Sequence, residues 1–146
     1  MTARLIEARL RQFLLGLAGV LCLGTVVELA LTEHTEQPLQ WVPFVLCGLG
    51  LAAVAAVLVR PGRATLWGLR LTMGALLAGA LLGSYQHGLS NLEIVRETHP
   101  NAAAAEAVGR ALAGAAPLLA PGILAVTAAV ALAATYYHPA LGQRAD

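Results

Sequence analysis

Residues whose side chains could bind a metal ion gather in two polar stretches, residues 28–41 and residues 87–99. Imidazole and carboxylate groups together suit Zn²⁺, and a set richer in nitrogen suits Cu²⁺. Both stretches lie at the ends of long apolar runs, so a membrane protein could bring them to one surface. The sequence therefore predicts a Zn or Cu site at that surface. Its candidate ligands are Glu28, His34, His87, Glu97 and His99.

The same region also has an interpretation that needs no ligand. The histidines come from three separate segments, and no local pattern such as HxxxH or HExxH joins them. Polar side chains at helix ends commonly satisfy free backbone groups there. On this interpretation the cluster is a hydrogen-bonded cap that anchors the loops. Its members would be Glu28, His34, Gln40, His87 and Asn91.

A third interpretation is a pocket for a quinone or a b-type haem. His34 and His87 could act as axial ligands or as hydrogen-bond partners of a quinone carbonyl. Trp41 and Tyr85 would then form its apolar walls. A membrane protein with two haems needs histidines buried at two depths, and this sequence places none in mid-membrane. Haem b is therefore less expected than Zn or Cu.

Catalytic and nucleotide-binding patterns are missing from the sequence. Its serines, Ser84 and Ser90, do not lie in GxSxG, and its single aspartate is Asp146. It contains neither a P-loop nor GxGxxG. A net charge of +1 without a basic patch gives no signal for nucleic acid. We expect a protein that is not an enzyme and does not bind nucleic acid.

The elements that position these residues are predicted to be membrane-spanning helices. The chain has 146 residues, of which 58% are hydrophobic and 12% charged, against roughly 25% charged in ordinary soluble domains. A bilayer core needs about 20 apolar residues per helix. Four segments qualify, and they form one all-α, polytopic membrane domain over residues 1–146, a compact four-helix bundle. The predicted spans are residues 10–32, 41–59, 65–86 and 117–137.

The first span could be mistaken for a secretory signal peptide, because arginines precede it. Its apolar region is longer than the usual 7–15 residues. We therefore expect it to remain as a helix of the folded protein.

One long connection, residues 87–116, joins the third and fourth spans. Pro100 interrupts it, and an alanine-rich stretch follows in which Glu106 and Arg110 stand at i,i+4. This pattern predicts a short extracytoplasmic helix within the connection.

Arginine placement sets the predicted orientation, because cytoplasmic loops of membrane proteins are enriched in positive charge. Both termini are expected in the cytoplasm of a bacterial inner membrane, with the histidine and glutamate cluster outside. The arginines on the inner side are Arg4, Arg9, Arg11, Arg60, Arg63 and Arg144.

Three residues within the predicted spans carry chemistry of their own. Arg70 is near enough to the inner face to extend its guanidinium there, or to form an anion site with neighbouring arginines. Cys22 and Cys47 lie inside apolar runs without CxxC spacing. We expect both cysteines to behave as small buried apolar residues.

Helix contacts inside a bilayer depend on small residues that let backbones approach. The third span has such a stripe in Ala75, Gly79 and Gly83. It could form the interface of a homo-oligomer or contact a partner protein. The alternative is that it serves packing within the bundle.

The function that the sequence favours is that of a small non-catalytic integral membrane protein. It would be an accessory or interaction subunit, or a homo-oligomer, with a polar His/Glu cluster on its extracytoplasmic face. The alternative is a ligand-binding membrane protein that holds Zn, Cu, haem or a quinone at that cluster.

Overall fold

Helices are the only regular secondary structure in residues 3–142, which are the residues that the computed structural model describes. This confirms the predicted all-α class. Arg144 and Asp146 lie outside the described residues. In chain order the helices are α1 (Ala3–Leu31), the 3₁₀ helix η1 (Pro38–Trp41), α2 (Val42–Val59), α3 (Arg63–Thr98), α4 (Ala104–Leu112), α5 (Gly122–Ala134) and α6 (Pro139–Gly142).

Three helical segments are long and apolar enough to cross a membrane within the described chain: α1, Pro38–Val59 and α3. The fourth predicted span, residues 117–137, is helical only as α5, which has 13 residues. At 1.5 Å per residue α5 covers about 20 Å, less than the roughly 30 Å of a bilayer core. Residues 117–121 form turns instead, because Pro117 and Pro121 lack the N–H groups that a helix needs.

Helix α3 continues well past the predicted end of the third span at residue 86. It has 36 residues, about 54 Å, and ends at Thr98. The change from apolar to polar sequence marks where lipid contact could end, whereas the helix itself stops before Pro100, which disfavours helical backbone at His99. Residues 87–98 of the predicted loop are therefore helical.

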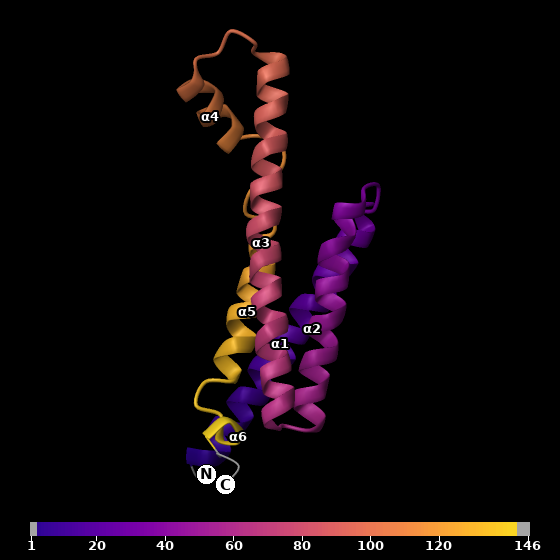
Figure 1. The fold of residues 1–146 in the computed structure, drawn as a ribbon, viewed down its shortest axis with the longest axis vertical. Coiled ribbons are helices and arrows are strands. Elements are labelled where there is room, and N and C mark those ends of the chain that lie inside the picture. The colour runs from indigo at the N-terminus through magenta and orange to yellow at the C-terminus, as the bar shows by residue number, and fades with distance from the viewer. Residues whose placement is uncertain (1–2, 143–146) are drawn as a thin grey trace.

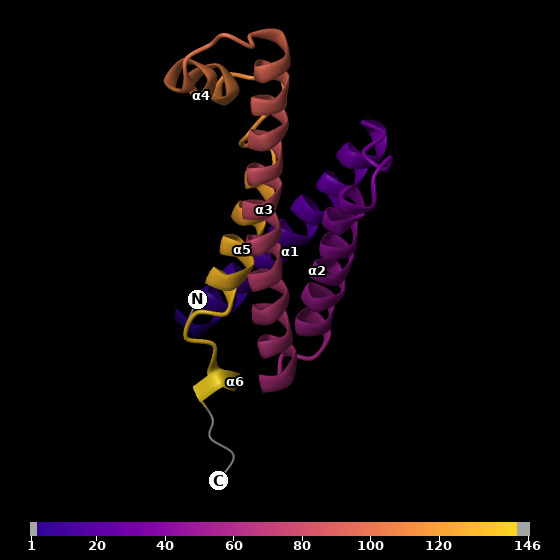
Figure 2. The same cartoon turned by 45° about the horizontal axis from the view of Figure 1, so that its top comes forward.

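The helices form a bundle whose two halves diverge toward one end (Figure 1). Helix α1 contacts α5 and α2, while α3 contacts α2 and α5. Figure 2 shows α1 running obliquely behind α3, so that its end lies with α2 and away from α3 and α5. Helix α4 folds back against the far end of α3. A cleft can therefore form between the two diverging halves.

The core lies in the half of the bundle where the helices converge. The buried face of α3 repeats at helical spacing and meets small residues of α1, α2 and α5. The α3 residues buried in this core are Leu66, Leu69, Met73, Leu76 and Ala80.

The glycines of the predicted small-residue stripe make contacts within the chain. A Cβ on Gly79 would lie 2.5 Å from Leu46 Cδ1, and one on Gly83 would lie 3.0 Å from Pro121. These two positions therefore let α2 and the start of α5 approach α3 closely. Ala75 is exposed. The geometry therefore favours the interpretation that both glycines serve packing within the bundle.

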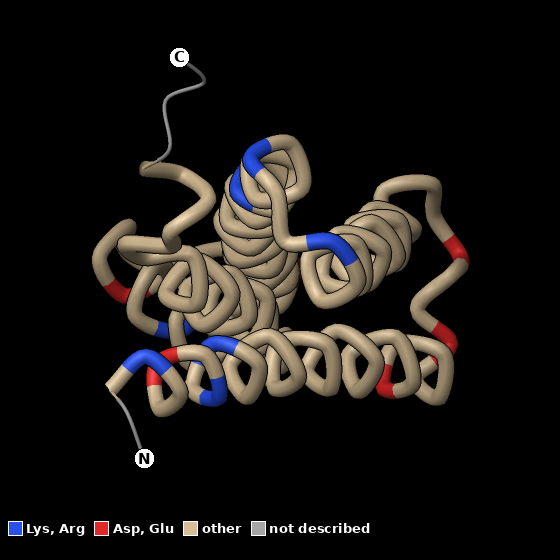
Figure 3. Tube along the Cα trace, turned by 90° about the horizontal axis from the view of Figure 1, so that it is seen from below, with Lys and Arg blue, Asp and Glu red and all other residues tan. Residues whose placement is uncertain are grey.

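Arginines gather at the end of the molecule where α1 begins and α2 turns into α3, and acidic residues occupy the loop after α1 (Figure 3). Two of these arginines hold the end of α5. Arg11 donates to the carbonyl oxygens of Tyr136 (3.3 Å) and Tyr137 (3.1 Å). Arg70 donates to Thr135 Oγ1 (3.0 Å) and to its carbonyl oxygen (3.3 Å). The guanidinium of Arg70 thus satisfies a helix C-terminus.

Candidate binding cleft

The cleft between the diverging halves has a volume of about 590 Å³, within the range of small-molecule sites. Its walls come from the end of α1, the region of η1, the middle of α3 and residues 116–124. Apolar side chains form much of the lining, among them Leu39, Leu46, Leu82 and Leu124. Its polar and ionisable side chains are Thr25, Glu28, Thr32, His34, Gln37, Gln40, Gln86, His87 and Ser90.

Three of the five predicted metal ligands, Glu28, His34 and His87, line this one cleft. Glu97 and His99 do not. They lie at the far end of α3, where ten residues of helix from His87 to Glu97 amount to about 15 Å. Within residues 3–142 no three His, Cys, Asp or Glu side chains are placed to hold a metal ion together. A metal at the cleft stays a prediction.

His87 is fixed by a backbone carbonyl of the neighbouring segment, residues 116–124. Its Nδ1 lies 2.9 Å from the oxygen of Pro117. A carbonyl oxygen can only accept, so Nδ1 carries the proton and donates it. In the neutral ring Nε2 is then an acceptor. Donation from one ring nitrogen to a carbonyl is the arrangement that orients functional histidines.

Asn91, one turn farther along α3, makes a two-way contact with the same segment. Its Nδ2 donates to the oxygen of Ala116 (2.8 Å), and the Ala116 N–H donates to Oδ1 (2.9 Å). Asn91 is only 1% exposed. A Cβ on Gly114 would overlap the Asn91 amide. His87 and Asn91 therefore anchor one wall of the cleft to α3, as the cap interpretation expects.

The other members of the predicted cap differ in whether their side chains form hydrogen bonds. Gln40 Oε1 accepts from the N–H of Gln37 (3.0 Å) at the start of η1. Glu28 and His34 line the cleft, and neither side chain forms a hydrogen bond with another residue of the described chain. The cap interpretation thus applies to His87, Asn91 and Gln40. The ionisable groups of Glu28 and His34 are open to a ligand.

The aromatic walls predicted for a quinone or haem pocket are not part of the cleft. Trp41 and Tyr85 are 52% and 61% exposed, and the apolar side chains that line the cleft are aliphatic instead. Trp41 stacks on Phe44 at 5.4 Å between ring centroids. The exposed position of Trp41 and Tyr85 is typical of aromatic residues at a membrane interface.

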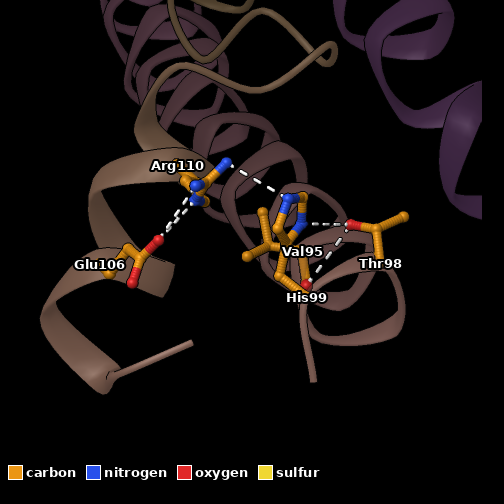
Figure 4. A network of polar contacts seen from close by, with 5 residues as sticks. All are labelled: Val95, Thr98, His99, Glu106 and Arg110. Carbon is orange, nitrogen blue, oxygen red and sulfur yellow. Dashed lines mark hydrogen bonds and ion pairs between the residues drawn. The ribbon is translucent and has the colours of Figure 1, made fainter. Parts of the chain in front are cut away.

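His99 belongs to a separate polar network at the end of α3 (Figure 4). Arg110 donates to Glu106 (3.0 Å) and to His99 Nε2 (3.3 Å). Since an arginine cannot accept, Nε2 is the acceptor, and Nδ1 donates to Thr98 Oγ1 (2.9 Å). This network joins α4 to the end of α3 and confirms the predicted i,i+4 pair.

No protein-family model, curated protein or solved structure matches this chain.

Proposed function

We propose that the protein is a small integral membrane protein that acts by binding rather than by catalysis. Three apolar helices of spanning length support this. We place it in a bacterial inner membrane with both termini in the cytoplasm, α5 as the fourth and shortest span, and the cleft at the extracytoplasmic end. The gathering of arginines at the opposite end supports this orientation.

The ligand proposed for the cleft is an amphiphile with an apolar chain and a polar head. One observation carries this proposal. A single cavity combines aliphatic walls with ionisable groups from three segments of the chain, Glu28, His34 and His87. A Glu28 carboxylate and the Nε2 of His87 are both acceptors. A head group with hydroxyl or amine donors would therefore fit best.

Native mass spectrometry of the protein extracted in a mild detergent tests this proposal. We expect about one amphiphile bound per chain, in line with a single cavity of this size. Ala120 lines the cleft, so Ala120→Trp should fill it and remove the bound molecule. Ala129→Trp is the matched control, since Ala129 is exposed on α5 outside the cleft. Equal occupancy in the two variants would contradict the proposal.

A second candidate function is that of an accessory subunit. The end of α3 and α4 stand apart from the bundle (Figure 1) and expose Ile94, Val108 and Leu112. Such a surface suits a partner protein or a second copy of the chain. A photo-crosslinking residue at Val108 should then give an adduct in intact membranes, whereas one at Glu36 should not. If the photo-crosslinking residue at position 108 gives no adduct, this would count against a subunit role for the surface.

A further inference from the structure

The α3 side of the cleft changes from apolar to polar along its length. The lining begins at Gly79 and ends with Gln86, His87 and Ser90. The eight residues from Gly79 to His87 span about 12 Å along the helix axis. At the apolar end, Leu46 Cδ1 would lie 2.5 Å from a Cβ on Gly79, so α2 and α3 close the cleft there. The cleft therefore has an apolar inner end and a polar mouth.

The α1 side of the cleft presents one carboxylate that has no partner. Thr25, Glu28 and Thr32 recur at helical spacing and line the cleft together. The hydroxyl groups of Thr25 and Thr32 each donate to the carbonyl oxygen four residues earlier, at 2.9 and 3.0 Å. Their hydrogens are thus used within the helix. The ion pairs of the described chain involve Glu7 and Glu106, so the Glu28 carboxylate is left for a ligand.

The charge of the cleft lining has one sign. Among the described residues that line the cleft, Glu28 is the only carboxylate and none is a lysine or an arginine. Arginines gather at the opposite end of the molecule instead (Figure 3). His87 adds an acceptor, because its Nδ1 proton is donated to the Pro117 oxygen and Nε2 faces no such donor. An anionic head group would therefore meet a carboxylate with no cation to balance it.

The volume of the cleft limits the size of its occupant. A cavity of about 590 Å³ holds on the order of twenty non-hydrogen atoms, if each takes roughly the 30 Å³ of a water molecule in the liquid. An amphiphile with a single chain and a small head has about this size. A phospholipid with two acyl chains is much larger, so at least one of its chains would lie outside the cleft.

We propose that the cleft binds a single-chain amphiphile with a cationic amine head. This inference rests on the proposed function and adds to it the sign of the head-group charge and the number of chains. An ammonium group has three donors and no acceptor, so it complements the Glu28 carboxylate and the Nε2 of His87 at the mouth. The chain extends past Leu82 toward Leu46 and Leu124. Fatty acids and anionic phospholipids are disfavoured by charge.

Three probes with the same alkyl chain test the charge preference: dodecylamine, dodecanol and dodecyl phosphate. The protein in a maltoside detergent is titrated with each probe, and the bound fraction is measured by native mass spectrometry. Binding to Ala120→Trp, in which the cleft is filled, is subtracted as the non-specific part. We expect dodecylamine to bind at least about tenfold more tightly than dodecyl phosphate, with dodecanol between them, because like charges placed together cost several kcal/mol.

A matched pair of variants assigns the preference to Glu28. Glu28→Gln keeps the shape of the side chain and removes its charge, so it should abolish most of the difference between dodecylamine and dodecyl phosphate. Glu36→Gln makes the same change at an exposed position outside the cleft lining. This control should keep the full difference.

The outcomes separate this inference from the proposed function. Probes that bind in the cleft with equal affinity, tighter binding of dodecyl phosphate, or a preference that survives in folded Glu28→Gln would overturn the inference alone. It would also be overturned if the molecule displaced by Ala120→Trp were a phospholipid with two chains. If no probe bound above the level of Ala120→Trp, the inference and the proposed function would both be overturned.

Discussion

Asn91 shows how one polar side chain can set the position of a whole wall of the cleft. Its amide satisfies both backbone groups of Ala116 in a buried setting. Gly114 leaves room for that amide because it has no Cβ. The sequence marks Asn91 only by its i,i+4 relation to His87. Its partner cannot be predicted, because Ala116 carries no side-chain signal and lies in an irregular segment.

We expect Asn91→Ala to lower the free energy of unfolding by about 2–4 kcal/mol, since it removes two hydrogen bonds and leaves buried backbone groups without partners. Thermal unfolding in detergent, followed by circular dichroism, measures this. The matched control is Asn101→Ala, at an exposed position, which should change stability little. Equal effects of the two substitutions would show that the Asn91 contacts do not hold the wall.

His138 should make stability depend on pH. Burial lowers the pKa of His138, and the positive charge of Arg11 lowers this pKa further. Its Nδ1 also accepts from the N–H of Ala140 (3.2 Å), which requires an unprotonated nitrogen. The contribution of His138 to stability is therefore present above its ordinary pKa and lost as the pH falls through the lower folded value.

Melting temperatures measured between about pH 7.5 and pH 5, the range in which histidine titrates, check this expectation. The melting temperature should fall with pH in the unaltered protein and fall less in His138→Asn, which keeps an acceptor that does not titrate. His34→Asn is the control, because it removes a histidine that is not next to Arg11. This variant should keep the fall in melting temperature. A fall that His138→Asn leaves unchanged would assign the effect to other groups.

At the scale of elements, α3 organises the molecule. It contacts α2, α4 and α5, and its glycines set how closely α2 and the start of α5 approach it. Spans one and two could be predicted to within a few residues, except that α1 begins earlier, because apolar composition and arginine boundaries determine both. The full length of α3 could not be predicted, because hydropathy indicates which residues can contact lipid and not where a helix ends. The turns over residues 117–121 could not be predicted either, because these residues are as apolar as those of a spanning helix.

Two glycine substitutions within α3 should act in opposite directions. Gly74→Ala meets nothing within 4 Å, so it should raise the unfolding free energy by about 0.5–1 kcal/mol through helix propensity. Gly83→Ala would place a methyl group 3.0 Å from Pro121, a ring that cannot rotate away. We expect a net loss of about 1–2 kcal/mol there. Chemical unfolding of both variants in the same detergent measures the difference, and a gain in both would contradict the close contact.

For the whole molecule, topology explains how the site could be partly predicted. Placing residues 28–41 and 87–99 on one side of a membrane predicts that Glu28, His34 and His87 lie near one another, and the three residues line one cleft. Glu97 and His99 do not line this cleft, because α3 extends well beyond it, and topology alone takes no account of that length.

The proposed orientation predicts which loops are accessible from each side. A cysteine introduced as Glu36→Cys, in the loop after α1, should react with a membrane-impermeant maleimide in intact cells. Arg63→Cys, at the α2–α3 turn, should react only after the cells are permeabilised. The buried Cys22 and Cys47 should contribute little background. Protection of the residue at position 36 would reverse the orientation.

The two arginines at the end of α5 also constrain the order of assembly during synthesis. Arg11 belongs to the first helix and Arg70 to the third, yet the carbonyl groups they bind lie at residues 135–137. Those acceptors are synthesised after α1, α2 and α3. A nascent chain with only its first three helices formed would lack these acceptors for Arg11 and Arg70 until α5 docks. Hydrogen bonds to Arg11 and Arg70 would then help to dock α5, in addition to the burial of its own apolar residues.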